Sequence, residues 1–404
     1  MDLQHLYGNE TLVKKAEKRI ENLKKEFLKN EGRNSCYVFS SPGRCEILGN
    51  HTDHNHGLVL VASISCDTLA VVDKNDENLV KIYSKGYDPV IVDLSNLSLN
   101  KDEYHTSNAL VRGIANAITQ KGFSISGFTA YTDSNIFKGA GVSSSASFEL
   151  LVAEIFNALF LNGVLTPVEK AIISQYAENV YFNKPCGLLD QSSIAIGSLI
   201  KLDFKDVKNP IATKLNTPLG YSLVITNTGG DHASLTSHYA KIRQEMTQVA
   251  NFFGKEVLRE VPYKEFLSQI PALKRHFSGR AIMRCVHFYK ENERVVACEN
   301  ALLSNDYKTF LNLVNESGNS SLSLLQNYYV PTDENQPVLL AVEYSKLIIK
   351  DGACRVHGGG FAGSVLAIVN DKEVDKYVSK MKKLFGNDNV FKANIRNVGA
   401  TQVE

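Results

Sequence analysis

The spacing of apolar and polar residues predicts a mixed succession of helices and strands. Between residues 11 and 30, apolar side chains recur every three or four positions with Lys and Glu between them, as in an amphipathic helix. Further helical patterns lie at 108–120, 148–161, 167–182 and 283–296. Clusters of β-forming residues predict strands at 37–40, 58–65, 127–132, 222–227 and 364–369, and a meander of three strands at 67–75, 80–85 and 89–94.

The pattern breaks around residues 205–220, where Pro210 and Pro218 stand among mixed polar residues. A chain of 404 residues is long enough for two domains with separate cores. We therefore place a domain boundary here, which divides the chain into residues 1–215 and residues 216–404.

Composition and charge argue against several classes of protein. The formal net charge is +1, so no overall field favours nucleic acid or membrane partners. The sequence has neither an apolar run of bilayer-spanning length nor the apolar core of a signal peptide. Its seven cysteines show no C-x-x-C spacing, which predicts free thiols in a reducing compartment. We therefore expect a cytoplasmic protein.

A turn of small residues, Gly139-Ala-Gly-Val-Ser-Ser-Ser-Ala146, joins the strand at 127–132 to the helix at 148–161. The first N–H groups of a helix lack intrahelical partners, and the helix dipole adds positive charge, so such a turn favours phosphate. Ser143, Ser144 and Ser145 add hydroxyls for phosphate or Mg²⁺. A serine N-cap after a flexible lead-in fits the same pattern. The turn is neither a P-loop nor G-x-G-x-x-G.

A second unusual stretch, residues 41–57, places many polar side chains between two predicted strands. They are Arg44, Glu46, Asn50, His51, Asp53, His54, Asn55 and His56. Such a concentration needs either solvent or a ligand. A zinc site from the three histidines and Asp53 is one alternative, but the spacing is too tight without a helix and no distant Cys/His cluster completes a ligand set.

Residues 42–55 resemble the galactokinase signature P-G-R-V-N-L-I-G-E-H-T-D-Y-N. Residues 139–146 and 352–363 resemble the second and third motifs, G-x-G-L-S-S-S-A and T-G-G-G-F-G-G, of the superfamily of galactokinase, homoserine kinase, mevalonate kinase and phosphomevalonate kinase. Residues 177–179, 186–191 and 231–239 resemble the family's A-E-N, C-G-I-M-D-Q and R-H-S-L-A-S-S-E-Y. The resemblance runs from about residue 37 to about residue 369, in the family's order.

The resemblance implies an α+β fold of two domains with the active site in the cleft between them. The N-terminal mixed α/β domain would hold the sugar and phosphate motifs. The C-terminal domain would be a ferredoxin-like α+β domain that supplies Tyr239 and the glycines at 358–360. The implied partners are a small-molecule sugar and ATP, without nucleic acid or membrane, in a monomer or weak homodimer.

The resemblance also implies ATP-dependent phosphorylation of the anomeric hydroxyl of galactose to give galactose 1-phosphate. Asp190 would be the base and Arg44 its electrostatic partner. Mg²⁺ would bind Ser145 and Glu178, with Ser144 as an alternative ligand. ATP would contact Gly139, Ala140, Gly141, Val142, Ser143, Ser144, Ser145 and Ala146. The sugar would contact Asn50, His51, Asp53, Gly187 and Tyr239.

Several departures from the family's motifs leave the identity of the sugar substrate open. Asn50 replaces a Glu that accepts a hydrogen bond from the galactose C6 hydroxyl, and Glu46 replaces an Asn. His54 replaces the family's Tyr, and Asp231 replaces its Arg. Asn50 can donate as well as accept, so L-arabinose and galacturonate are alternative substrates. A sugar- and ATP-binding sensor without kinase activity is a further alternative, although the serine-rich loop, Asp190 and Arg44 are all present.

Overall fold

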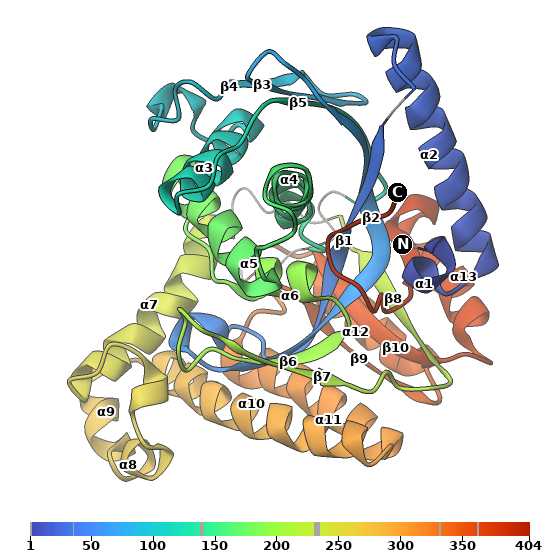
Figure 1. Ribbon diagram of the computed structural model, residues 1–404. Coiled ribbons are helices and arrows are strands. Elements are labelled where there is room, and N and C mark those ends of the chain that lie inside the picture. Colours follow the sequence, from blue (N-terminus) through green and yellow to red (C-terminus); the bar gives the residue numbers. More distant parts are fainter. Residues whose placement is uncertain (1, 35, 138–140, 230–234, 331–332, 362) are drawn as a thin grey trace.

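Two β-sheets form the framework of the protein in a computed structural model that describes residues 2–34, 36–137, 141–229, 235–330, 333–361 and 363–404 (Figure 1). The first sheet has the order β12-β1-β2-β5-β3-β4, with β6 beside β2 and β7 beside β6. Its strands are β1 Tyr37–Leu48, β2 Leu58–Lys74, β3 Leu79–Ser84, β4 Val90–Asp93, β5 Phe128–Ser134, β6 Leu199–Asp203, β7 Ile211–Leu215 and β12 Thr401–Gln402.

The second sheet has the order β11-β8-β10-β9, and every neighbouring pair is antiparallel. Two of its helices, α12 and α13, share a core with one of its faces. This β-α-β-β-α-β succession, with the first and third strands central, is the expected ferredoxin-like arrangement. The elements are β8 Tyr221–Asn227, α12 Pro337–Ile348, β9 Gly352–His357, β10 Ser364–Asn370, α13 Val374–Phe385 and β11 Val390–Ala393.

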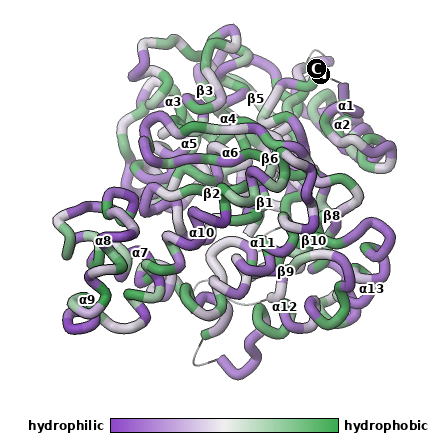
Figure 2. Tube along the Cα trace, turned by 90° about the horizontal axis from the view of Figure 1, so that it is seen from below, coloured by the Kyte–Doolittle hydropathy of each residue, from purple (hydrophilic) through white to green (hydrophobic). Residues whose placement is uncertain are grey.

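The remaining helices cover the sheets or extend from them. Helices α7 to α9 project to one side of the molecule in both views (Figures 1 and 2). Among the described residues, no helix has the length and apolar character needed to cross a bilayer. The helices are α1 Leu3–Tyr7, α2 Glu10–Glu31, α3 Ser107–Gln120, α4 Ser144–Phe160, α5 Pro167–Tyr176, α6 Leu189–Ile196, α7 Thr236–Phe252, α8 Tyr263–Ser268, α9 Ile270–His276, α10 Gly279–Leu303 and α11 Tyr307–Ser320.

Helix α4 runs through the middle of the N-terminal part, with α3, α5 and α6 and the curved first sheet around it (Figure 1). Its residues are apolar on nearly all sides, and most of them are buried, as expected for a central helix. A separate core lies between the two sheets and joins both to α10 and α11. The N-terminus of α4 is thereby held in a fixed place relative to both sheets.

The structure corrects two expectations about the first sheet. The strand predicted at 37–40 does not end at Ser40, because β1 continues through a bulge at Pro42/Gly43 to Leu48. Only Phe39 and Ser40 pair with β12, so beyond them that edge of β1 tolerates a proline. The predicted meander is also wrong. Strands β2 and β3 are not neighbours, because β5 lies between them and runs parallel to β3.

Other features agree with the sequence or stay open. All seven cysteines are free thiols. The change of sheet falls between β7 and β8, near the predicted boundary, but β12 returns to the first sheet at the end of the chain. The division into residues 1–215 and 216–404 stays a prediction.

Candidate active site

The predicted catalytic pair, Arg44 and Asp190, forms a bidentate ion pair. Arg44 lies on β1 and Asp190 in the first turn of α6. Nε of Arg44 donates to Oδ1 of Asp190 over 2.7 Å, and a terminal guanidinium nitrogen donates to Oδ2 over 3.0 Å. The hydroxyl of Ser143 also donates to Oδ2, and Arg44 donates to the carbonyl of Gly141. The pair is therefore joined directly to the small-residue turn.

Opposing effects set the protonation state of Asp190. Burial alone would raise the pKa of its carboxyl group, but the charge of Arg44 and the hydrogen bonds from Arg44 and Ser143 outweigh burial and lower the pKa. The side chain of Asp190 is 35% exposed, whereas that of Arg44 is 9% exposed. An ionised carboxylate thus faces open space while its partner is held in place.

The turn before α4 has the geometry of an anion site. Gly141 and Ser143 have φ angles of 64° and 62°, so the chain turns through the left-handed region immediately before the helix. Ser143 makes no side-chain cap, which rules out the simple N-cap interpretation for this residue. Ser144 and Ser145 open the helix, and their hydroxyls make no side-chain hydrogen bond to the other described residues. Val142 and Ala146 are buried beneath the turn.

Gly139 and Ala140 lie outside the described residues, so the start of the predicted ATP loop stays a prediction. The described part leaves the first N–H groups of α4 without intrahelical acceptors, as at every helix start. These groups, the helix dipole and the two free hydroxyls together suit a phosphate.

Two buried carboxylates lie behind Asp190, one of them the predicted metal ligand Glu178. The two oxygens of Glu178 accept from Lys184 Nζ over 2.8 Å and from Gln191 Nε2 over 2.7 Å. Gln191 Nε2 also reaches Oε2 of Glu149 over 3.1 Å. Oε1 of Glu149 is buried without a partner among the described residues, and burial followed by the charge of Glu178 raises the pKa of Glu149.

This arrangement fits a magnesium ion. Mg²⁺ prefers oxygen ligands and is commonly held by one or two carboxylates together with substrate phosphates. Glu178 and the hydroxyl of Ser145 are ligands of that kind, and Oε1 of Glu149 is a buried oxygen without a partner among the described residues. Within the described ranges, no group of three or more His, Cys, Asp or Glu residues is arranged to hold a metal by itself.

Three of the predicted sugar residues, Asn50, His51 and Tyr239, bind the glycine turn after β9. The Asn50 amide donates to the carbonyl of Gly358 over 2.6 Å, and a ring nitrogen of His51 lies 2.9 Å from the carbonyl of Gly359. The hydroxyl of Tyr239 donates to the carbonyl of Gly360 over 3.0 Å. The first and third motifs are therefore locked together, with Tyr239 of α7 as a third member.

Asn50 itself is almost wholly enclosed. It is 1% exposed, and its amide nitrogen also donates to Oε1 of Glu46 over 2.9 Å. Its amide oxygen accepts from Asn327 Nδ2 over 2.7 Å. A ring nitrogen of His287, on α10, lies 3.0 Å from the backbone carbonyl of Asn50, so α10 makes a buried structural contact here. Direct sugar contact by Asn50 stays a prediction, because the protein already occupies its amide.

Asp53 and Gly187 lie together at an open cavity of about 330 Å³. A Cβ atom at position 187 would collide with Oδ2 of Asp53, so any larger residue there would displace the Asp53 carboxylate. Burial raises the pKa of Asp53 to about 6, and the charge of Asp190 adds to that rise. Arg243 of α7 lines the same cavity and lowers the pKa. The cavity therefore offers a carboxylate beside the catalytic pair, as a sugar hydroxyl requires.

Sequence reasoning missed four contributors to this site: Gln191, Glu149, Arg243 and Asn327. Gln191 follows Asp190 directly in the C-G-L-L-D-Q segment, so the motif itself could have suggested it. Arg243 lies one helical turn after Tyr239, which places both on one face of α7. Asn327 carries no signal in the sequence, because its partner Asn50 is 277 residues away.

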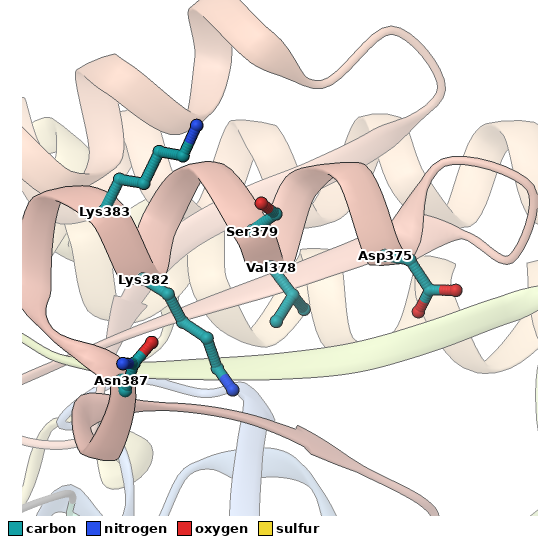
Figure 3. A pocket seen from close by; sticks show the side chains of 6 residues that line it. All are labelled: Asp375, Val378, Ser379, Lys382, Lys383 and Asn387. Carbon is teal, nitrogen blue, oxygen red and sulfur yellow. The ribbon is translucent and has the colours of Figure 1, made fainter.

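A larger concavity elsewhere belongs to a different surface. It measures about 500 Å³ and lies against α13, lined by Asp375, Val378, Ser379, Lys382, Lys383 and Asn387. Figure 3 shows Lys382 and Lys383 pointing to different sides of the helix, so their charges do not converge on one ligand. None of the motif residues lines it.

The overall arrangement defines a class of small-molecule kinase. Residues 109–198 match the model "GHMP kinases N terminal domain", and residues 25–74 match the "Galactokinase galactose-binding signature". The fold is similar to a crystal structure of Lactococcus lactis galactokinase complexed with galactose, with a TM-score of 0.82, 24% identity, and coverage of 95% of this chain and 100% of that one. A mevalonate kinase structure is more distant, with a TM-score of 0.63 at 14% identity over 89% of this chain and 99% of that chain.

Relatives of similar sequence identify the family within this class of kinases. A galactokinase from Clostridium tetani is 32% identical over 90% of this chain and 91% of its own length. One from Clostridium acetobutylicum is 30% identical over 92% and 93%. The chain belongs to the galactokinase family, and so to the ATP-dependent sugar kinases. The arabinose, galacturonate and sensor alternatives are not favoured.

Proposed function

We propose that the protein transfers the γ-phosphoryl group of MgATP to the anomeric hydroxyl of galactose, with the site residues in the roles given below. The observation that carries the proposal is the bidentate pair of Arg44 and Asp190 bonded to the turn before α4. It sets an ionised carboxylate next to an anion site, where a hydroxyl and a phosphate can meet.

The reaction asks the chain mainly to position its substrates and to neutralise charge. The turn at 141–146 and the start of α4 hold the ATP phosphates. As the sugar oxygen bonds to phosphorus, the bond from phosphorus to the β–γ bridging oxygen breaks and ADP leaves. The hydroxyl proton passes to Asp190. Its low pKa suffices, because the hydroxyl becomes strongly acidic once its oxygen bonds to phosphorus.

The charges around the transfer have separate sources. Arg44 keeps Asp190 ionised and lies close enough to the turn to offset charge on the moving phosphoryl group. Ser145 and Glu178 would hold Mg²⁺, with Ser144 as the alternative ligand, and the ion would supply positive charge that neutralises the phosphates. In this structure Glu178 accepts a hydrogen bond from Lys184.

The sugar binds next to Asp53 and Gly187. A carboxylate accepts from two donors, so Asp53 suits two adjacent ring hydroxyls. His51 and Tyr239 bind the carbonyls of the glycine turn and form the opposite side of the sugar site. Asn50 is the last of the predicted sugar-binding residues. Its hydrogen bond to Gly358 holds the glycine turn in place.

Measurement of ATP consumption against a panel of sugars tests the proposal. The panel contains galactose, N-acetylgalactosamine, L-arabinose, galacturonate, glucose and a blank without sugar. We expect turnover led by galactose, with the product phosphorylated at C1 by NMR. A lead for arabinose or galacturonate would correct the substrate, and no turnover with any sugar would overturn the proposed activity.

A further inference from the structure

Two residues of the first motif have exchanged places relative to the galactokinase signature. The signature has Asn and then, four positions later, Glu; this chain has Glu46 and Asn50. The two side chains are bonded to each other, from Asn50 Nδ2 to Glu46 Oε1 over 2.9 Å. An amide and a carboxylate are thus both kept, but the carboxylate now comes from β1.

Glu46 lies on the side of β1 that carries the catalytic pair. Side chains two positions apart on a strand point to the same face, so Glu46 shares a face with Arg44. The residues on either side of Glu46, Cys45 and Ile47, are buried in the core between the sheets. Two residues advance a strand by roughly 7 Å, which is comparable with the span of a pyranose ring.

The two oxygens of Glu46 have different surroundings. Oε1 accepts from Asn50 and from Arg355, whose nitrogen lies 3.3 Å away. None of the described residues donates to Oε2, and the side chain keeps 8% of its surface exposed. Asn50 differs, because both ends of its amide are bonded within the protein. Of the two exchanged residues, only Glu46 keeps an acceptor for a ligand.

The charges nearby are consistent with a carboxylate that meets a hydroxyl. Burial raises the pKa of Glu46 to about 7, while Arg355, Arg44 and the hydrogen bond from Asn50 oppose this rise. At pH 8 most of the Glu46 side chains are therefore ionised. A buried carboxylate with a free oxygen gains from a hydroxyl donor.

We infer that Glu46 is a specificity-determining residue of the sugar site, whose Oε2 accepts a hydrogen bond from the sugar C6 hydroxyl. Asn50 holds Glu46 in position for that contact. The inference rests on the proposed function, because it concerns how the same site reads its sugar.

The test compares galactose with 6-deoxygalactose, which lacks only the C6 hydroxyl, at pH 8. In the wild-type chain we expect a lower KM for galactose. In Glu46→Gln we expect the galactose KM to rise by roughly 10- to 100-fold, the loss of one hydrogen bond to a charged group, while the KM for 6-deoxygalactose changes less than about threefold. The value of kcat should stay nearly constant for both sugars.

A double variant, Glu46→Asn with Asn50→Glu, serves as the matched control. It restores the signature order and keeps one amide and one carboxylate in contact, so it should recover the preference for galactose. Thermal unfolding of each variant checks that the bond from Arg355 to the Ile47 carbonyl still supports β1.

The outcomes separate the two claims. Equal losses for both sugars in Glu46→Gln would mean a purely structural role and would overturn the inference alone. A wild-type chain that turns over galactose without preferring it to 6-deoxygalactose would do the same. A wild-type chain without turnover on either sugar would overturn the proposed function, and this inference with it.

Discussion

Two Arg–Asp centres involve the first two strands, and they differ in how completely each carboxylate is enclosed. Asp67 of β2 has no exposed side-chain surface and accepts from Tyr7, from Ser40 and, over 2.7 Å, from Arg19. Arg396, near the end of the chain, lies 3.5 Å from it and is equally buried. The Asp67 centre therefore ties both ends of the chain to the sheet.

The second centre is Asp190 with Arg44 and Ser143, and its carboxylate keeps about a third of its side-chain surface open. A fully enclosed carboxylate has no capacity left for a substrate, whereas a partly open one can still accept a proton. Both centres combine an aspartate with a guanidinium and a serine hydroxyl, and the Asp67 centre adds Tyr7 and a second arginine. Exposure separates a structural ion pair from a catalytic candidate.

The largest effect should come from Asp190→Asn. We expect kcat to fall by roughly a thousandfold, because the amide cannot accept the hydroxyl proton. Binding of galactose, measured by calorimetry, should change little, since the side chain keeps its size. Full activity in this variant would remove Asp190 from the role of base.

The matched change in the enclosed centre is Asp67→Asn. Here we expect a loss of about 3–5 kcal/mol in the free energy of unfolding, because Arg19 and Arg396 lose their shared buried counter-charge. Denaturant unfolding measures this loss, and kcat of the folded fraction should be unchanged. A lower kcat with wild-type stability would contradict the comparison.

Arg44→Lys should lower kcat by about a hundredfold, since lysine cannot make two parallel bonds to the carboxylate. Losing the guanidinium also removes the paired hydrogen bonds that help to lower the pKa of Asp190, so that pKa should rise. The acid limb of the pH–kcat profile should therefore move to higher pH. An unshifted limb would show that Arg44 does not set the protonation of Asp190.

Gly187→Ala should raise the galactose KM by roughly tenfold or more, because the added Cβ displaces the Asp53 carboxylate. Steady-state kinetics with both substrates measures the change, and the KM for ATP should stay within about twofold. Gly163→Ala is a suitable control for a glycine substitution: its Cβ would meet no atom nearby, and any cost should appear in stability alone.

The smallest effect should come from pH. Asp53 has a pKa of about 6, above its ordinary value, so it is about one-tenth ionised at pH 5 and mostly ionised at pH 7. Ionised Asp53 accepts through both oxygens, whereas protonation makes one oxygen a donor, so the galactose KM should fall by about tenfold from pH 5 to pH 7. Asp190, with its lowered pKa, stays ionised throughout, so kcat at saturating sugar should vary less than KM.

Much of this molecule could be predicted from local pattern. The amphipathic spacing of residues 11–30 predicted α2 nearly to its ends, and the strands at 222–227 and 364–369 became the central pair of the second sheet. The zinc alternative could be weighed from spacing alone. The motifs nominated Arg44 and Asp190 as a pair, and they lie in contact.

Tertiary structure decided the rest. Nothing local shows that β1 passes through Pro42 and Gly43, because the bulge depends on β2 opposite them. Nothing local inserts β5 between β2 and β3. The sequence showed that Glu46 and Asn50 depart from the signature, but only the tertiary structure shows that the two side chains are bonded to each other.

The sequence by itself determined the kinds of elements, the turn before α4 and the chemical groups available for catalysis. The tertiary structure decided which carboxylate is open, which is sealed, and which partners each one has. The physical reason is the distance along the chain between the residues that interact. Periodicity reports burial among residues two to four positions apart, whereas Arg44 meets Asp190 across 146 residues and Asn50 meets Asn327 across 277. Packing of the whole chain brings such groups together and sets the solvent access of each.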